Sequence, residues 1–388
     1  MKTKMTFIIL LGLNLGFTFM NLPPALENLM VLYGAMYTEI AVLMSALLWT
    51  HAAIQVPGGM ISDRIGTRAA LFISLFFMLA GNLLASVAPN LGLAILGRVL
   101  SGTGTGLGFI ATMKMIAIIA PPGRAGSYQA QLGGAFSIGS VVAYMTIPHI
   151  SLWGWRWIYL VPSLVCLPLA GILFIIKLQE RQGPFRAEVS LKQILRMPPG
   201  WILGIYHALS YGSVLTLGNW IPSLLAEVWP GQTATQLAWG GASVMLISGV
   251  GRMGGGFVLL RFPSMLIANG SIFVLFLLFS SLCLLRVPSA VMITAFLAAL
   301  FASVNFGAFW DLASRAVPSR SLGTLFGFVN LLANLGAVCF TLMFGWIKDQ
   351  FGTFSWGFGI IALITIWSLL IGRRILYSMV DNASRSEP

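Results

Sequence analysis

The chain has 388 residues, of which 58% are hydrophobic and only 8% are Asp, Glu, Lys or Arg. A soluble protein carries about 25% charged residues, so this composition excludes a protein that is wetted over its whole surface. The formal net charge of +12 does not indicate nucleic-acid binding, because the basic residues lie scattered in short loops rather than in one cluster.

Apolar runs long enough to cross a bilayer recur along the whole chain, whereas the alternating pattern of a membrane β-barrel is absent from the sequence. We therefore predict an all-α membrane protein with twelve transmembrane helices in two pseudo-symmetric six-helix bundles. No small-x-small cleavage site follows the first run, so we interpret it as a retained helix rather than a signal peptide. The predicted spans are residues 5–26, 38–61, 69–88, 91–117, 126–147, 157–177, 201–225, 237–259, 265–285, 289–312, 322–346 and 355–376.

The distribution of basic residues predicts how these spans are oriented in the membrane. Sixteen of the 22 Lys and Arg residues fall in loops on the side of the N-terminus, and only Arg156, Arg286 and Lys348 fall on the other side. Because positive loops stay in the cytoplasm, both termini are predicted to be cytoplasmic. We expect a monomer in the bilayer of a prokaryotic inner membrane.

A longer polar connection divides the spans six and six. The predicted domains are an N-terminal bundle (1–178), a cytoplasmic linker (179–200) whose short interfacial helix Ser190 would cap, and a C-terminal bundle (201–388). The halves echo each other at an offset of about 197 residues, since "GGMISDR" (58–64) matches "GGFVLLR" (255–261). Such repeats are typical of transporters that bind their substrate between the two halves, near the bilayer midplane.

The loop between the second and third spans concentrates charge in an otherwise apolar region. Gly59 and Gly66 allow a tight turn, and Asp63 is expected to be held by Arg64 and Arg68 or by helix ends. Such a cluster can act as a latch between two rigid bodies.

The pattern Gly59-x-x-x-Asp63-Arg64-x-Gly66-x-Arg68 resembles the signature loop of the major facilitator superfamily, and "GRVLSGTGTG" (97–106) is similar to its fourth-helix pattern. The resemblance implies two bundles that alternately expose a central site, with this loop as an inner gate element. The fifth span lacks the Gly-Pro pair of the superfamily's drug:proton antiporters, and Leu260 replaces the acid in the second-half loop. Two segments, 217–225 and 323–337, are partly similar to the anion:cation symporter branch, although its helix-4 glutamate is missing.

Charges and amides within the spans are candidate substrate contacts. Arg252 either binds substrate or is an arginine near the cytoplasmic face that snorkels or forms a structural pair, for which Asp311 is a candidate. Arg98 either contacts substrate or braces its helix through backbone carbonyls, and Lys114 faces either the cavity or headgroups. His51 carries a coupling proton, bonds the substrate, or is simply packed. The predicted substrate-binding residues are Asn14, His51, Gln55, Arg98, Lys114, Tyr211, Arg252, Asn330 and Asn334.

The charged residues within the predicted spans are mostly basic, and a positively charged cavity attracts anions. We therefore predict a secondary active transporter that moves a small organic or inorganic anion by alternating access, in symport with protons. The alternative is a proton-driven exporter of drugs or metabolites. An enzyme is not expected, because no nucleophile–base pair is evident, and neither is a cofactor or metal, because Cys166, Cys283 and Cys339 lie apart in apolar runs.

Overall fold

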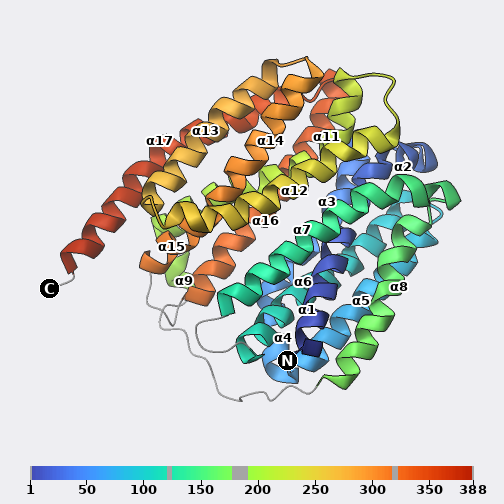
Figure 1. Cartoon of the computed structure of the whole chain (residues 1–388), viewed down its shortest axis with the longest axis horizontal. Coiled ribbons are helices and arrows are strands. Elements are labelled where there is room, and N and C mark those ends of the chain that lie inside the picture. The colour runs from blue at the N-terminus through green and yellow to red at the C-terminus, as the bar shows by residue number, and fades with distance from the viewer. Residues whose placement is uncertain (1, 120–124, 177–190, 317–321, 387–388) are drawn as a thin grey trace. The chain divides into compact units, whose positions relative to one another are not determined.

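The computed structural model describes residues 2–119, 125–176, 191–316 and 322–386, and in these residues every regular element is a helix (Figure 1). Contacts group the chain into two compact units. The first comprises Met1–Gln182 and Gly218–Leu246, and the second comprises Gly183–Leu217 and Ile247–Pro388. The predicted domain boundaries at residues 178 and 200 follow chain order and stay a prediction.

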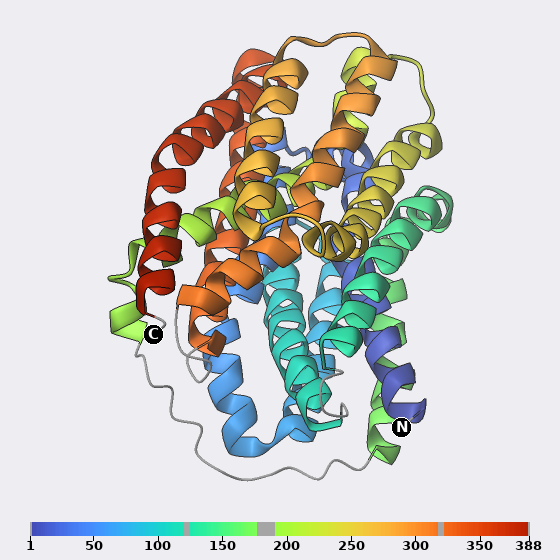
Figure 2. The same cartoon turned by 60° about the vertical axis from the view of Figure 1, so that its left-hand side comes forward.

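The first unit begins with the N-terminal helices and the short turns between them. Its elements are α1 (Lys2–Met20), the 3-10 turn η1 (Pro23–Ala25), α2 (Leu26–Tyr33), α3 (Tyr37–Ala53), α4 (Gln55–Ile65), α5 (Thr67–Ser86), α6 (Leu91–Ile119), α7 (Ala125–Ile150), the turn η2 (Ser151–Trp153) and α8 (Trp157–Ile175). α5 packs against α6 and α8, and α1 packs against α7 and α8 (Figures 1 and 2).

The second unit contains most of the remaining helices. The elements after residue 190 are α9 (Leu191–Ile194), α10 (Pro198–His207), the π-helical turn η3 (Ala208–Gly212), α11 (Ser213–Val228), α12 (Ala234–Leu259), α13 (Ser264–Leu284), α14 (Pro288–Val304), α15 (Phe306–Ala316), α16 (Leu322–Phe351) and α17 (Ser355–Ser386). α11 and α12 each belong partly to both units. Most of the predicted linker, including Ser190, lies outside the described residues, and α9 is the part that is described.

Ten segments of the described chain are long and apolar enough to cross a membrane, and they coincide with ten of the predicted spans. The other two predicted spans, 38–61 and 201–225, are helical but interrupted. The first breaks at Ile54 between α3 and α4, and the second contains the π-turn η3 between α10 and α11. Neither α3 nor α10 nor α11 alone is therefore as long as the hydrocarbon core requires.

The first break has a simple cause in the sequence. Pro57 has no N–H, so the carbonyl of Ala53 loses its regular helical donor, and the helix resumes at Gln55. A third interruption separates α14 from α15 at Asn305, whose side-chain amide donates to the hydroxyl of Ser210 (2.8 Å). These breaks bring polar groups into the interior of the spans.

Close helix crossings fill the interior of the first unit. Its core gathers aliphatic and aromatic side chains from α1, α5, α6 and α8, among them Phe7, Leu71 and Leu169. Where α1 crosses α7 there is no room for side chains, since a Cβ at Gly139 would lie 2.0 Å from the carbonyl oxygen of Leu13. Small residues that let backbones touch are a general means of joining membrane helices.

We expect Gly139→Ala to lower the free energy of unfolding by about 1–3 kcal/mol, because the added methyl group forces the α1 backbone away. Gly134→Ala on the same helix is the matched control, since a Cβ there meets nothing within 4 Å and alanine favours the helix by about 1 kcal/mol. Thermal unfolding of the purified variants in detergent measures both. Equal unfolding temperatures for the two variants would contradict this account of the crossing.

Candidate functional site

Arg252 lies in the glycine-rich middle of α12, and its guanidinium is sandwiched by aromatic rings. The guanidinium carbon lies 5.6 Å from the ring centre of Tyr211 in η3 and 5.4 Å from that of Phe306 at the start of α15. These are cation–π distances. Within the described residues the guanidinium forms no hydrogen bond and no ion pair, so its N–H donors remain available to a ligand.

A cluster of rings surrounds His207 beside this arginine. The buried imidazole lies 5.6–6.0 Å, centre to centre, from the rings of Tyr211, Phe306, Phe309 and Trp310. We call these five residues the aromatic cluster. Its members come from α10, η3 and α15, so Arg252 and the aromatic cluster form one site within the second unit.

Two backbone irregularities position these side chains. The π-turn η3 shifts Tyr211 out of α-helical register, and the break at Asn305 starts α15 with Phe306. The Asn305–Ser210 hydrogen bond joins the two irregular segments. A second bond of 2.8 Å links Ser248 on α12 to Ser303 on α14, and thereby places Arg252 against the same region. Isolated π-turns are frequent at functional sites.

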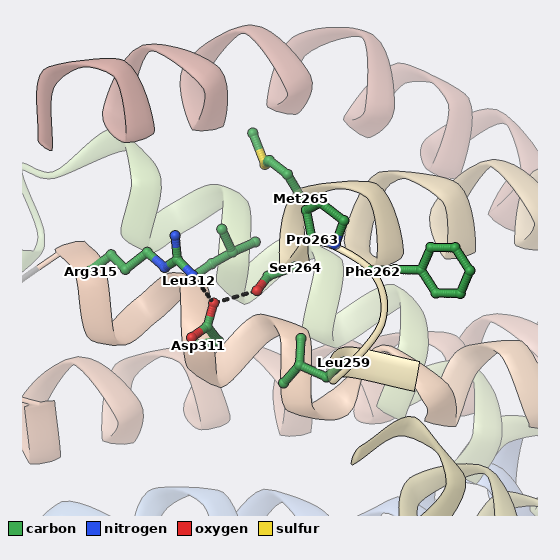
Figure 3. Close-up of a pocket in the computed structure, with 8 residues that line it drawn as sticks. All are labelled: Leu259, Phe262, Pro263, Ser264, Met265, Asp311, Leu312 and Arg315. Carbon is green, nitrogen blue, oxygen red and sulfur yellow. Dashed lines mark hydrogen bonds and ion pairs between the residues drawn. The ribbon is translucent and has the colours of Figure 1, made fainter. Parts of the chain in front are cut away.

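The sequence left open whether Arg252 binds substrate or is a structural arginine that snorkels or pairs with Asp311. Its predicted structural partner, Asp311, instead forms an ion pair with Arg315 (2.8 Å) and accepts a hydrogen bond from the hydroxyl of Ser264 (Figure 3). These groups line a pocket of about 240 Å³ that also includes Leu259, Phe262, Pro263, Met265 and Leu312. Asp311 thus pairs with Arg315, and substrate binding by Arg252 stays a prediction.

The predicted asparagines of α16 lie on one face, as their spacing requires. The amide of Asn334 donates to the carbonyl of Asn330 (2.8 Å), and its own buried carbonyl oxygen has no hydrogen-bond partner in the described part of the chain. An unpaired buried acceptor of this kind is costly unless a ligand or water completes it. Asn334 therefore stays a candidate for substrate contact.

His51 forms the centre of a second candidate cluster, in the first unit. Its Nδ1 lies 3.1 Å from the hydroxyl of Thr105, and its ring contacts those of Phe19 and Phe109 at 5.0 and 6.0 Å. Because the Thr105 hydroxyl donates to the carbonyl of Gly102, its oxygen is placed to accept from Nδ1–H. That tautomer leaves Nε2 as a proton acceptor, and Gln55 is buried one turn further along.

Arg98 and Asn14 have contacts that indicate bracing. Arg98 is only 1% exposed and donates to the carbonyl of Thr18 (2.9 Å) and to the side chain of Asn21 (3.2 Å), which in turn bonds the carbonyl of Ile158. Asn14 donates to the carbonyl of Pro162 (3.2 Å). Both side chains thus join α1 to its neighbours.

Lys114 supports the signature loop rather than facing a headgroup. Its ammonium donates to the carbonyl of Ser62 (2.9 Å) in the last turn of α4, just before Gly66 reverses the chain with a φ of +89°. A cation there is favoured by the negative end of the helix dipole. Asp311 bonds Ser264 at the opposite, positive end of a helix, the start of α13.

Among the other residues of the signature loop, some contact neighbouring helices and others are exposed. Arg68 donates to the carbonyls of Leu173 and Phe174 at the end of α8, and so holds that helix end. Arg64 is exposed and Gly59 is half-buried. The side chain of Asp63 lies outside the described residues, so its predicted salt bridges with Arg64 and Arg68 stay a prediction.

Tyr211 is among the site residues predicted from the sequence, whereas His207, Phe306 and Trp310 are not. The signal that could have found Phe306 and Trp310 is the run of aromatics in "NFGAFWD" (305–311), two of them one helical turn apart. What could not be read from the sequence is the helix break at Asn305, because the side chain that pairs with Asn305 is nearly a hundred residues away.

Comparison with known proteins gives the same architecture over nearly the whole chain. The sequence pattern of the Major Facilitator Superfamily matches residues 8–341. The structure superimposes on that of a D-xylose-proton symporter with a TM-score of 0.76, covering 94% of this chain and 96% of that one at 16% identity. At that identity the likeness shows the fold alone.

Curated relatives have diverse substrates in their names. A D-galactonate transporter of Escherichia coli is 24% identical over 374 residues, 86% of this chain and 85% of its own length. A cyanate transport protein of Escherichia coli is 23% identical over 57% of this chain and 58% of its own length. A rubrofusarin-specific efflux pump of Gibberella zeae is 26% identical over 54% of this chain, but only 36% of the pump's own length is matched.

Ten long apolar helices in the described part of the chain are typical of an integral membrane protein. The chain belongs to the Major Facilitator Superfamily. Its fold is the twelve-helix fold of that family, and the predicted fold class is confirmed.

We expect Arg98→Met to lower the free energy of unfolding by about 2–3 kcal/mol, because the carbonyl of Thr18 and the amide oxygen of Asn21 lose a charged donor in a buried site. Arg64→Met removes an exposed arginine and is the matched control. Thermal unfolding measures both. An unfolding temperature unchanged by Arg98→Met would show that Arg98 is not a brace.

Proposed function

We propose that the protein is a secondary transporter of a small anion, with Arg252 binding the anionic group. The observation that carries this proposal is a guanidinium stacked on Tyr211 and Phe306 with no acid bonded to it in the described part of the chain. Arginine presents paired N–H donors in one plane, which match the oxygens of a carboxylate or oxyanion, while rings on its faces leave that edge open.

Two relatives support the anion class. Cyanate and D-galactonate are both small anions, and the proteins named for their transport match more than half of this chain. We further propose that transport is by alternating access in the cytoplasmic membrane of a prokaryote, that both termini are cytoplasmic, and that the protein acts as a monomer. The asymmetric loop charges support this orientation.

Proton coupling is the second part of the proposal. His51 is a buried histidine of the first unit, and its Nε2 is left as a proton acceptor by the Thr105 contact. Symport of an anion with a proton also reduces the net charge that crosses the membrane.

A second candidate function is proton-driven export of drugs or other metabolites. The match to an efflux pump and to a multidrug resistance protein B homolog of Mycobacterium tuberculosis, 33% identical over 204 residues, favours it. The matched segments span about a third of the length of each of those proteins, 36% in both cases. Uptake of lincomycin into inside-out vesicles in exchange for protons, with no transport of small anions, would establish export instead.

Proteoliposome uptake of D-galactonate and cyanate, compared with neutral D-xylose, tests the anion proposal. We expect Arg252→Ala to lower anion uptake about a hundredfold, because a charged hydrogen-bonded pair is worth about 2–5 kcal/mol. Arg252→Lys keeps the charge but loses the paired geometry, so an intermediate loss is expected. Arg286→Ala, an exposed arginine in the loop before α14, is the control. Uptake that is confined to neutral or cationic solutes, or that is unchanged in Arg252→Ala, would remove the proposal.

Replacing His51 tests the coupling. His51→Gln is expected to abolish accumulation driven by a pH gradient while leaving exchange of labelled for unlabelled anion intact, because exchange needs no net proton movement. His149→Gln, at an exposed position near the end of α7, should leave both activities unchanged. Full gradient-driven accumulation in His51→Gln would assign the coupling to another group.

A further inference from the structure

Tyr144 forms an unusual contact in the first unit. It lies in the last two turns of α7, its side chain is 0% exposed, and its hydroxyl donates to the carbonyl of Gly218 on α11. The same hydroxyl lies 3.7 Å from the sulfur of Met20 on α1. One side chain therefore joins α7 to a helix that comes seventy residues later.

The carbonyl that Tyr144 bonds is one that α11 cannot satisfy in the regular way. In an α-helix the carbonyl of Gly218 accepts from the N–H of residue 222, but residue 222 is a proline and has no N–H. In a lipid-spanning segment no water is present to replace that donor, and an unsatisfied backbone group is costly. The Tyr144 hydroxyl supplies the missing hydrogen.

The ring of Tyr144 fits against a second glycine. A Cβ at Gly241 of α12 would lie 2.2 Å from Cε1 and 2.5 Å from Cζ of Tyr144, so only glycine leaves room for the ring. Close by, Tyr37 of α3 contacts Trp220 of α11 with ring centres 5.9 Å apart. The segments that begin at Gly218 and end at Leu246 are thus held on the N-terminal helices at several points.

These segments are the parts of α11 and α12 that belong to the first unit, whereas the remainder of each helix belongs to the second. On α11 the residues up to Leu217 belong to the second unit, and those from Gly218 onward belong to the first. Tyr144 also lies near the C-terminal end of α7. A transporter that opens this end must detach 218–246 from α7.

We propose that Tyr144 is a latch that holds residues 218–246 in the closed arrangement by satisfying the carbonyl that Pro222 leaves without a donor. Release is tolerated because opening admits water, which replaces the hydroxyl. The proposal rests on the transporter function, but its test needs no substrate, so it can fail while the anion proposal stands.

The test measures how fast a membrane-impermeant maleimide labels a reporter cysteine at Ser223, a buried position on the docked part of α11. The reporter is placed in the full chain with Cys166, Cys283 and Cys339 changed to serine. We expect Tyr144→Phe to raise the labelling rate about fivefold, the effect of losing one hydrogen bond of about 1 kcal/mol. Gly241→Ala, which fills the space of the ring, should raise it as well.

A double-mutant cycle separates the hydrogen bond from simple packing. Pro222→Ala restores an N–H for the Gly218 carbonyl, so Tyr144→Phe should change labelling less than twofold in that background. Tyr159→Phe is the matched control, because the Tyr159 hydroxyl is buried but has no hydrogen-bond partner in the described part of the chain. Labelling unchanged by Tyr144→Phe, or effects of Tyr144→Phe and Pro222→Ala that multiply independently, would overturn the proposal.

Discussion

The constraint on which the structure depends is that a backbone group inside a bilayer must find its hydrogen bond within the protein. The spans of this chain are interrupted by prolines, glycines and a π-turn, and each interruption leaves carbonyls that need donors. Side chains supply several of them: Lys114 bonds Ser62, Arg98 bonds Thr18, and Tyr144 bonds Gly218.

This constraint distinguishes the cations that bond backbone carbonyls from Arg252. Arg98, Lys114 and Arg68 all donate to backbone carbonyls, and their positive charge lies at helix ends or in buried turns. Arg252 differs, because rings cover its faces and its donors bond no group among the described residues. A charge within a membrane span is costly, so a guanidinium whose donors bond no described group is a candidate for ligand binding.

The sequence predicted the helices better than the roles of their polar residues. Span positions follow from long apolar runs and loop charges, which are local properties, and the signature loop could be recognised from five residues. The break at Asn305 and the π-turn at residues 208–212 depend on a hydrogen bond between distant segments, so the aromatic cluster could not be assembled from the sequence. The bonds of Lys114 and Arg98 to the carbonyls of Ser62 and Thr18 likewise join segments that are far apart in the sequence.

Family membership alone does not decide the substrate, since the relatives are named for an organic acid, a small inorganic anion and a pigment. The central claim is that the unpaired guanidinium of Arg252 makes the site selective for negative charge. The most direct measurement is the thermal unfolding temperature of the purified protein titrated with small anions, D-galactonate first, and with D-galactose, the related neutral sugar. Because a ligand that binds the native state stabilises it, the account predicts a concentration-dependent rise with an anion and none with the sugar. Equal stabilisation by the neutral sugar, or no stabilisation by any small carboxylate or oxyanion, would contradict it.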